Sequence, residues 1–217
     1  MSLAVVCPSR GRPDTCAQMA QSVIDTSEAD VLLYFDLDDS TAPALGVLDG
    51  PRVNVVHGPP VGRGNAINAL CDQFKDYRMY LLVSDDVKFI RLGWDKDIAK
   101  AMDSFGDDIG LVHLAGSCSV QLTPDPWVNW PCVSRKWIDA VGWFNYPECK
   151  WFCQDTILQA LAEGIDRIKR IDDICIHHLN INHDDMGPRL AEDQNKFMWF
   201  FANGYGSCLN RLRGAMA

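Results

Sequence analysis

The stretch that decides the expected fold is YLLVSDDVKF, residues 80–89. Residues 79–83 are apolar and rich in strand-forming types, which predicts a strand buried on both faces. Asp85 and Asp86 follow directly, so they are expected at the carboxyl end of that strand. Ligands bind at this end of open α/β sheets, because the loops there converge in a crevice. The alternative interpretation is a solvated turn.

The two adjacent acids also need a partner of opposite charge. Neighbouring carboxylates repel each other and lose hydration when they are buried, so a positive charge usually compensates them. A hard divalent cation with oxygen ligands is the natural candidate. Asp85 and Asp86 therefore predict a cation site.

Length and charge restrict the class of protein. The chain has 217 residues, of which 47% are hydrophobic, so it can bury the core of a single α/β domain. Its formal net charge of -9 excludes a global positive field that would attract nucleic acid or anionic membrane, although a local basic patch stays open. No apolar stretch approaches the length of a membrane span, and we expect a soluble, cytoplasmic protein without a membrane partner.

The nine cysteines are scattered singly and form no CxxC pair. An odd number within apolar patterns is typical of reduced thiols in a reducing compartment. Cys149, Cys153, His177 and His178 offer zinc ligands in principle, but their spacing does not match a zinc knuckle.

Strands and helices alternate through the first half of the sequence. Strands are predicted at residues 3–7, 31–35, 52–56 and 79–83, with helices over 16–24 and 67–74. This order indicates a mostly parallel central sheet flanked by helices. The stretch GRGNAI at residues 62–67 lacks the third glycine of a dinucleotide fingerprint, and no P-loop motif is present. An arginine at a helix amino end remains, which suits a diphosphate.

The second half has a helix at residues 94–105, strands at 109–113 and 127–134, and an exposed loop at 116–125. A short helix follows at 135–141, and another begins near Gln154 and Asp155 and stops at Gly164. A strand within residues 168–176 leads into a histidine cluster. A final helix around residues 197–201 is expected to cross the sheet or to act as a lid.

The order of these motifs resembles the GT-A (Rossmann-like) fold of nucleotide-sugar glycosyltransferases, particularly the family 2-like enzymes and small relatives encoded by phages. The resemblance extends from residue 3 to about residue 183. The stretches that carry it are VVCPSRGR (5–12), DLDD (36–39), GRGN (62–65), SDD (84–86), VSR (133–135), VGWF (141–144), QDTILQALAEG (154–164) and HH (177–178).

The resemblance implies a role for each matching residue. Nucleotide-sugar binding would fall to Pro8, Ser9, Arg10, Arg12, Asp36, Asp38, Asp39, Arg63, Asn65, Ser84 and Asp85. Asp85 and Asp86 would hold Mn²⁺ or Mg²⁺ on the diphosphate, completed by His177 or His178. Asp155 matches the position of the catalytic base. Residues 1–90 would form the nucleotide-sugar half of one domain, and residues 91–217 the acceptor-binding and catalytic half.

The sequence departs from the family pattern at two positions. Val83 stands where an acid is usual, two residues before Asp85, and Gln154 stands where glutamate usually precedes the catalytic base. Among the aromatic residues, Trp130, Trp143 and Trp151 are the acceptor-binding candidates, because an aromatic face can stack on a sugar or a nucleobase. For most of them, plain packing is the stronger interpretation.

The expected function is a metal-dependent, inverting glycosyltransferase. The donor would be a nucleoside-diphosphate sugar, with a UDP-sugar favoured, and the acceptor a hydroxyl of a glycan or of a hydroxymethylated base in DNA. If the protein is viral, it would act in the host cytoplasm. Two alternatives stay open, a sugar nucleotidyltransferase and a non-catalytic module that binds nucleotide sugars.

Overall fold

Strands and helices alternate along the computed structural model, which describes residues 2–41, 50–118, 128–179 and 186–216. The described strands are β1 (Leu3–Ser9), β2 (Asp30–Asp36), β3 (Val53–Gly58), β4 (Met79–Leu82), β5 (Val87–Phe89), β6 (Leu111–Cys118), β7 (Pro131–Ser134) and β8 (Ile168–His178). The described helices are α1 (Pro13–Thr26), α2 (Arg63–Gln73), α3 (Trp94–Asp103), α4 (Arg135–Val141), α5 (Gln154–Gly164), α6 (Met186–Asn203) and α7 (Tyr205–Ala215).

The described strands form one sheet in the order β3-β2-β1-β4-β7-β6-β8-β5. Strands β3, β2, β1 and β4 are parallel, so the carboxyl ends of β1, β2 and β4 meet at one edge. The sheet turns antiparallel at β7, and β8 pairs parallel with β6 and antiparallel with β5. The prediction of an α/β domain with a largely parallel sheet is confirmed.

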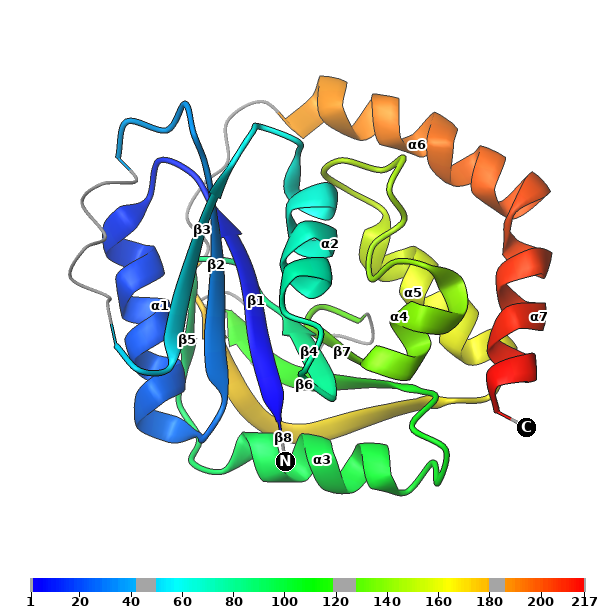
Figure 1. Cartoon of the computed structure of the whole chain (residues 1–217), viewed down its shortest axis with the longest axis horizontal. Coiled ribbons are helices and arrows are strands. Elements are labelled where there is room, and N and C mark those ends of the chain that lie inside the picture. Colours follow the sequence, from blue (N-terminus) through cyan, green and yellow to red (C-terminus); the bar gives the residue numbers. More distant parts are fainter. Residues whose placement is uncertain (1, 42–49, 119–127, 180–185, 217) are drawn as a thin grey trace.

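Two hydrophobic cores lie on the two faces of the sheet. Helices cover both faces (Figure 1). Alternate residues of each strand point to opposite faces, so Val6 and Leu82 enter one core while Val5 and Leu81 enter the other. Helices α1 and α3 close the second face. Helices α2, α4, α5, α6 and α7 contribute to the first core. The segment that joins α4 to α5, residues 142–153, contributes Phe144, Tyr146 and Cys149 to the same core.

The structure corrects several predicted boundaries. Strand β5 was not expected, because a three-residue strand is too short to show a pattern. Residues 116–118 extend β6 instead of starting a loop, because they pair with Ile176, His177 and His178 of β8. The remainder of the predicted loop, residues 119–125, lies outside the described residues. Strand β7 begins only at Pro131, and Trp127 also falls outside the described part.

The carboxyl-terminal region holds two helices where one was predicted. Helix α7 packs against α4 and α5, and α6 packs against α7 and against the residues that join α4 to α5, rather than across the sheet (Figure 1). Arg211 donates to the carbonyl of Val141 at the end of α4, and Arg213 donates to the carbonyl of Gly164 at the end of α5. These cations satisfy carbonyls that a helix end leaves without partners. None of the described helices is both long and apolar enough to span a membrane.

We expect Gly64→Ala to destabilise the fold. A Cβ at this position would lie 2.1 Å from Gln154 Nε2 and 2.7 Å from the carbonyl oxygen of Cys149, so α2 and the segment before α5 would have to separate. Overpacking of this kind costs about 2 kcal/mol. Urea unfolding measures the loss. Gly206→Ala in α7 is the matched control, because nothing lies within 4 Å of its Cβ, and an equal loss there would contradict the interpretation.

Candidate functional site

The carboxyl edge of the parallel strands brings Ser9, Asp85 and Asp86 together. Ser9 is the last residue of β1, and its Oγ donates a hydrogen bond to Asp85 Oδ2 over 2.6 Å. Asp85 and Asp86 are 1% and 0% exposed, so they do not form a solvated turn. Two carboxylates are thus held inside the protein at the point where the fold converges its loops.

Arg12 compensates this pair from the loop after β1. Its Nη2 lies 2.7 Å from Asp85 Oδ1, and its Nη1 lies 3.3 Å from Asp86 Oδ2. Burial raises the pKa of Asp85 above its ordinary value, while the Ser9 hydrogen bond and the positive charges of Arg12 and Arg63 act in the opposite direction. Arg12 therefore supplies part of the positive charge that the sequence predicted beside Asp85 and Asp86.

His178 reaches Asp86 because β8 pairs with β5. This pairing sets His178 opposite Val87, and the backbone N–H of Leu179 donates to the carbonyl of Asp86 over 2.9 Å. As a result, His178 Nε2 lies 3.3 Å from Asp86 Oδ1. Burial raises the pKa of Asp86, but hydrogen bonds from His178 and Ser84 outweigh it and hold that pKa well below its usual value.

The two predicted histidines have different surroundings. Adjacent residues of a strand point to opposite faces, so His177 turns away from Asp86 and its Nδ1 lies 3.3 Å from Ser117 Oγ. His178 also meets the edge of the buried Trp130 ring, with ring centroids 6.1 Å apart. Of the two histidines, only His178 is held against the carboxylate pair.

The residues present fit a divalent cation that the substrate helps to bind. Within the described residues, no group of three or more acidic, histidine or cysteine side chains is arranged around one point. Asp86 Oδ1 and His178 Nε2 are nevertheless close enough to contact the same ion. Mg²⁺ is commonly held by one or two carboxylates while phosphate oxygens and water supply the remaining ligands. Asp86 matches that pattern as the carboxylate, and the His178 imidazole would add a nitrogen ligand.

A second acidic group follows β2 at the same edge. Arg10 Nη1 lies 2.7 Å from Asp36 Oδ2 and 2.5 Å from Asp38 Oδ1, which lowers the pKa of Asp38. The backbone N–H of Gly11 donates to the buried Asp39 over 2.8 Å. The predicted nucleotide-binding loop, whose first two residues Pro8 and Ser9 the structure places in β1, is thereby fixed to the predicted acidic stretch.

The amino end of α2 follows the carboxyl end of β3 and so lies at the same edge of the sheet. Arg63 opens the helix, and Asn65 donates to the carbonyl of Pro147 over 3.2 Å. The backbone N–H of Gly64 donates to the carbonyl of Lys150 over 3.1 Å. The segment that joins α4 to α5 is therefore attached to the helix end where a diphosphate was predicted.

Asp155 lies exposed in the first turn of α5. In the part of the chain that the structure describes, its Oδ1 accepts only local hydrogen bonds, from the N–H and Oγ1 of Thr156 over 2.8 and 3.4 Å. Gln154 is buried instead and donates from Nε2 to the carbonyl of Cys149 over 2.8 Å. The glutamine that departs from the family pattern thus has a structural role, and Asp155 keeps a carboxylate at the surface.

The three candidate tryptophans divide between packing and exposure. Trp130 is 7% exposed and its ring fills the space above Gly116. Trp143 packs edge-on against Tyr146 and Phe200, with ring centroids 5.7 and 6.1 Å away. Trp151 is half-buried, and the guanidinium of Arg189 lies 4.7 Å from its ring centroid. Of the three tryptophans, Trp151 is the one in residues 150–152, directly before the start of α5 and Asp155.

Sequence reasoning missed Asp193 on α6. This carboxylate is 0% exposed and accepts hydrogen bonds from the backbone N–H groups of Lys150, Trp151 and Phe152. A charged residue among the apolar positions of α6, between Leu190 and Phe197, was the available signal. Asp193 fixes the segment that precedes Asp155.

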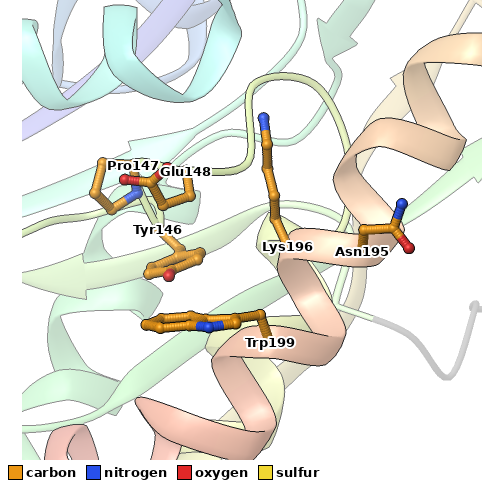
Figure 2. Close-up of a pocket in the computed structure, with 6 residues that line it drawn as sticks. All are labelled: Tyr146, Pro147, Glu148, Asn195, Lys196 and Trp199. Atoms are coloured by element: carbon orange, nitrogen blue, oxygen red, sulfur yellow. The ribbon is translucent and has the colours of Figure 1, made fainter.

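A pocket of about 440 Å³ lies between α6 and the preceding part of the same segment. Figure 2 shows the rings of Tyr146 and Trp199 one above the other, with Lys196 extending along the pocket wall. Its lining residues are Tyr146, Pro147, Glu148, Asn195, Lys196 and Trp199. The Trp199 side chain is 58% exposed.

Comparisons with known proteins identify the fold. No protein-family model and no curated protein match the sequence. The structure matches residues 1–349 of S. aureus TarS with a TM-score of 0.63 and 15% identity, covering 94% of this chain and 74% of that one. TarS in complex with UDP-GlcNAc gives a TM-score of 0.67 at 13% identity, with 85% and 60% covered. The chain spans 40% of the longer TarS structure.

A second kind of neighbour is the mannosyltransferase PcManGT from Pyrobaculum calidifontis, solved in complex with GDP-Man and Mn²⁺. It matches with a TM-score of 0.63 and 10% identity, covering 98% of this chain and 73% of that one. These neighbours are GT-A-type glycosyltransferases. The chain therefore has the GT-A glycosyltransferase fold, as the sequence predicted.

We expect Asp86→Asn to lose about 2 kcal/mol of unfolding free energy at pH 7 in metal-free buffer, because Arg12 and His178 lose a charged acceptor. The pKa of Asp86 is lowered on folding, so its contribution is complete above the unfolded pKa. That contribution falls as the pH drops below about 4. Urea unfolding at pH 7 and pH 3 should show the gap between wild type and variant shrinking.

The control is Asp139→Asn, which removes an exposed pair with Arg135 on α4. Such pairs contribute about 0.5 kcal/mol or less. A gap for Asp86→Asn that stays constant from pH 7 to pH 3 would contradict the assigned charge state.

Proposed function

We propose that the protein is a glycosyltransferase that moves a sugar from a nucleoside-diphosphate sugar to an acceptor hydroxyl. The observation that carries the proposal is the contact of the arginine loop after β1 with the carboxylate pair after β4, with Arg12 Nη2 2.7 Å from Asp85 Oδ1. The GT-A fold supports it, and the structural neighbours were solved with UDP-GlcNAc and with GDP-Man. A UDP-sugar is the donor we favour.

The donor would lie along the carboxyl edge of β1, β2 and β4. Arg10 with Asp36, Asp38 and Asp39 would bound the nucleoside, together with Pro8, Ser9 and Ser84. Arg63 would approach the diphosphate from the amino end of α2, where the helix dipole adds to its charge. Asn65 is tied to Pro147 and would hold the wall of this site.

Asp86 and His178 are the residues that would hold Mn²⁺ or Mg²⁺, with Asp85 beside them. A divalent cation bound there supplies Lewis-acid neutralisation of the charge that develops on the leaving nucleoside diphosphate. Arg12 neutralises the same carboxylates in its absence, which keeps two buried acids ordered before the donor binds.

Asp155 would take the proton of the acceptor hydroxyl. A hydroxyl is a weak nucleophile, so a carboxylate within hydrogen-bond reach accepts its proton as the bond to the anomeric carbon forms and the bond to the diphosphate oxygen breaks. Asp155 Oδ1 contacts only its own helix turn among the described residues, which leaves Oδ2 to face a substrate. A single displacement of this kind inverts the anomeric centre.

The acceptor would be a glycan, with a hydroxymethylated DNA base as the second possibility. For the second one, we expect the cations of α6 and α7 to contact the DNA phosphates, and each of them already has a contact within the protein. Arg189 lies over Trp151, Lys196 pairs with Glu192 over 2.8 Å, and Arg211 and Arg213 donate to helix carbonyls. These are the cations that would otherwise contact DNA phosphates.

Turnover of radiolabelled nucleotide sugars on a glycan panel with Mn²⁺ or Mg²⁺ tests the proposal. Release of a nucleoside diphosphate together with labelled glycan is the expected result. Pyrophosphate release from a nucleoside triphosphate and a sugar phosphate would instead identify a nucleotidyltransferase. Tight donor binding without transfer or hydrolysis would identify a non-catalytic module.

We expect Asp155→Asn to lower kcat by about 10³-fold, because the variant cannot accept the acceptor proton. Its melting temperature should stay within about 1 °C, since exposed substitutions change stability little. Glu163→Gln, an exposed substitution in the same helix, is the control and should keep wild-type turnover. Full activity of Asp155→Asn on the true acceptor would remove this residue from the reaction.

We expect Arg63→Met to weaken UDP binding in the presence of Mn²⁺ by about 10-fold, because one charged hydrogen-bond donor to phosphate is lost. Isothermal titration calorimetry measures the change. Lys100→Met on α3 removes an equal charge from an exposed site on the opposite face and should leave the affinity unchanged. Equal weakening by both variants would mean that only net charge matters.

A further inference from the structure

The segment that leads into Asp155 is held by one buried carboxylate. Asp193 Oδ1 accepts the N–H of Lys150 over 3.0 Å, and its Oδ2 accepts the N–H groups of Trp151 and Phe152 over 2.7 and 2.9 Å. Three successive backbone donors therefore converge on a single side chain. Hydrogen bonds to an ionised acceptor are about twice as strong as neutral ones.

The position of Asp193 requires a reason, because a fully buried acid on a helix is costly. The nearest ammonium group, Lys196 Nζ, lies 3.9 Å from Asp193 Oδ1, so the backbone donors carry most of the compensation. Two further contacts join α6 to the same segment. Arg189 lies over the ring of Trp151, and Lys150 Nζ lies 3.8 Å from Glu192 Oε1.

The segment needs this support because its own backbone is irregular. It ends at Cys153, whose φ of 63° is left-handed, and α5 starts at the next residue. A left-handed residue other than glycine persists only where the surroundings fix it. Asp193 fixes the three preceding peptides, so it sets where α5 begins and where Asp155 stands.

We propose that Asp193 is a positioning residue for the transfer reaction, acting through the segment Lys150 to Phe152 on the proposed base Asp155 and on Trp151. The inference rests on the proposed function for its kinetic consequence. Its structural part stands on the three hydrogen bonds alone. In this proposal α6 holds residues 150–152 in place, and it does not open and close over the site as a lid would.

Two contacts tie the same segment to the donor side. The carbonyl of Lys150 accepts the N–H of Gly64 in α2, and the carbonyl of Pro147 accepts a hydrogen bond from Nδ2 of Asn65 in the same helix. A segment fixed by α2 on one side and by Asp193 on the other holds the acceptor residues in register with Arg63. Release of the Asp193 contacts should therefore affect catalysis more than donor binding.

Asp193→Asn tests the proposal, because it keeps the shape but turns one acceptor atom into an amide donor that faces backbone donors. We expect kcat to fall by about 30-fold, since small misplacements of catalytic groups cost up to about 100-fold. The acceptor KM should rise, and the Kd for UDP with Mn²⁺ should stay within about twofold. Hydrogen exchange at the amides of Lys150, Trp151 and Phe152 should accelerate at least tenfold below the melting temperature.

Asp95→Asn is the matched control. Asp95 is also buried, at 1% exposed, and accepts a backbone N–H, that of Glu28, but it lies on α3 across the sheet. This variant should lose stability without a change in kcat or in the exchange of the Lys150 to Phe152 amides. If Asp193→Asn does not fold, Arg189→Ala loosens Trp151 from the exposed side and should shift kcat in the same direction, by a smaller factor.

The outcomes separate this inference from the proposed function. If wild-type protein shows no turnover but Asp193→Asn accelerates exchange at the three amides, the proposed function fails, while the structural role of Asp193 in holding residues 150–152 is supported. If turnover is present and Asp193→Asn changes donor Kd and kcat by the same factor, as a general loss of folded protein would, the positioning role is overturned. Unchanged exchange at the three amides overturns it as well.

Discussion

The buried carboxylate pair after β4 is the constraint on which the rest of the site depends. Asp85 and Asp86 are enclosed, and two acids in that position require charge compensation. Arg12 provides it from the loop after β1, while Ser9 at the end of β1 donates a hydrogen bond to Asp85 and His178 at the end of β8 lies beside Asp86. The requirement brings together parts of the chain that are far apart in sequence at one edge of the sheet, where we propose that a phosphate-bound cation binds.

The segment between α4 and α5 contacts one helix from the first half of the sequence and one from near its end. Its residues contact α2 through Gly64 and Asn65, and they contact α6 through Asp193. Helix α2 begins beside the carboxylate edge, and we propose that α2 and α6 together set the position of Asp155 relative to Arg63. A nucleotide-sugar half and an acceptor half, as proposed for this chain, would meet at this segment.

Much of this architecture could be predicted from the sequence, because apolar runs followed by acids mark strand ends whatever the rest of the chain does. The helix at Arg135–Val141 was bounded correctly, since Ser134 caps it and Gly142 closes it. Strand β5 and the split between α6 and α7 were missed, because their patterns are short or are set by tertiary pairing. The sequence predicted that a cation would compensate Asp85 and Asp86. It did not predict that Arg12 pairs with both carboxylates, because that pairing depends on the geometry of the loop after β1. Asp193 was missed although it stands among the apolar positions of α6, because its partners are backbone N–H groups, which leave no pattern in the sequence that would show what it binds.

The most direct measurement of the central claim is a crystal structure with Mn²⁺ and UDP bound. The account predicts anomalous density for Mn²⁺ in contact with the Asp86 carboxylate, beside His178, with the diphosphate on the same ion and near Arg63. A nucleotide bound away from the carboxyl ends of β1, β2 and β4, with Asp85 and Asp86 still paired only to Arg12, would contradict it.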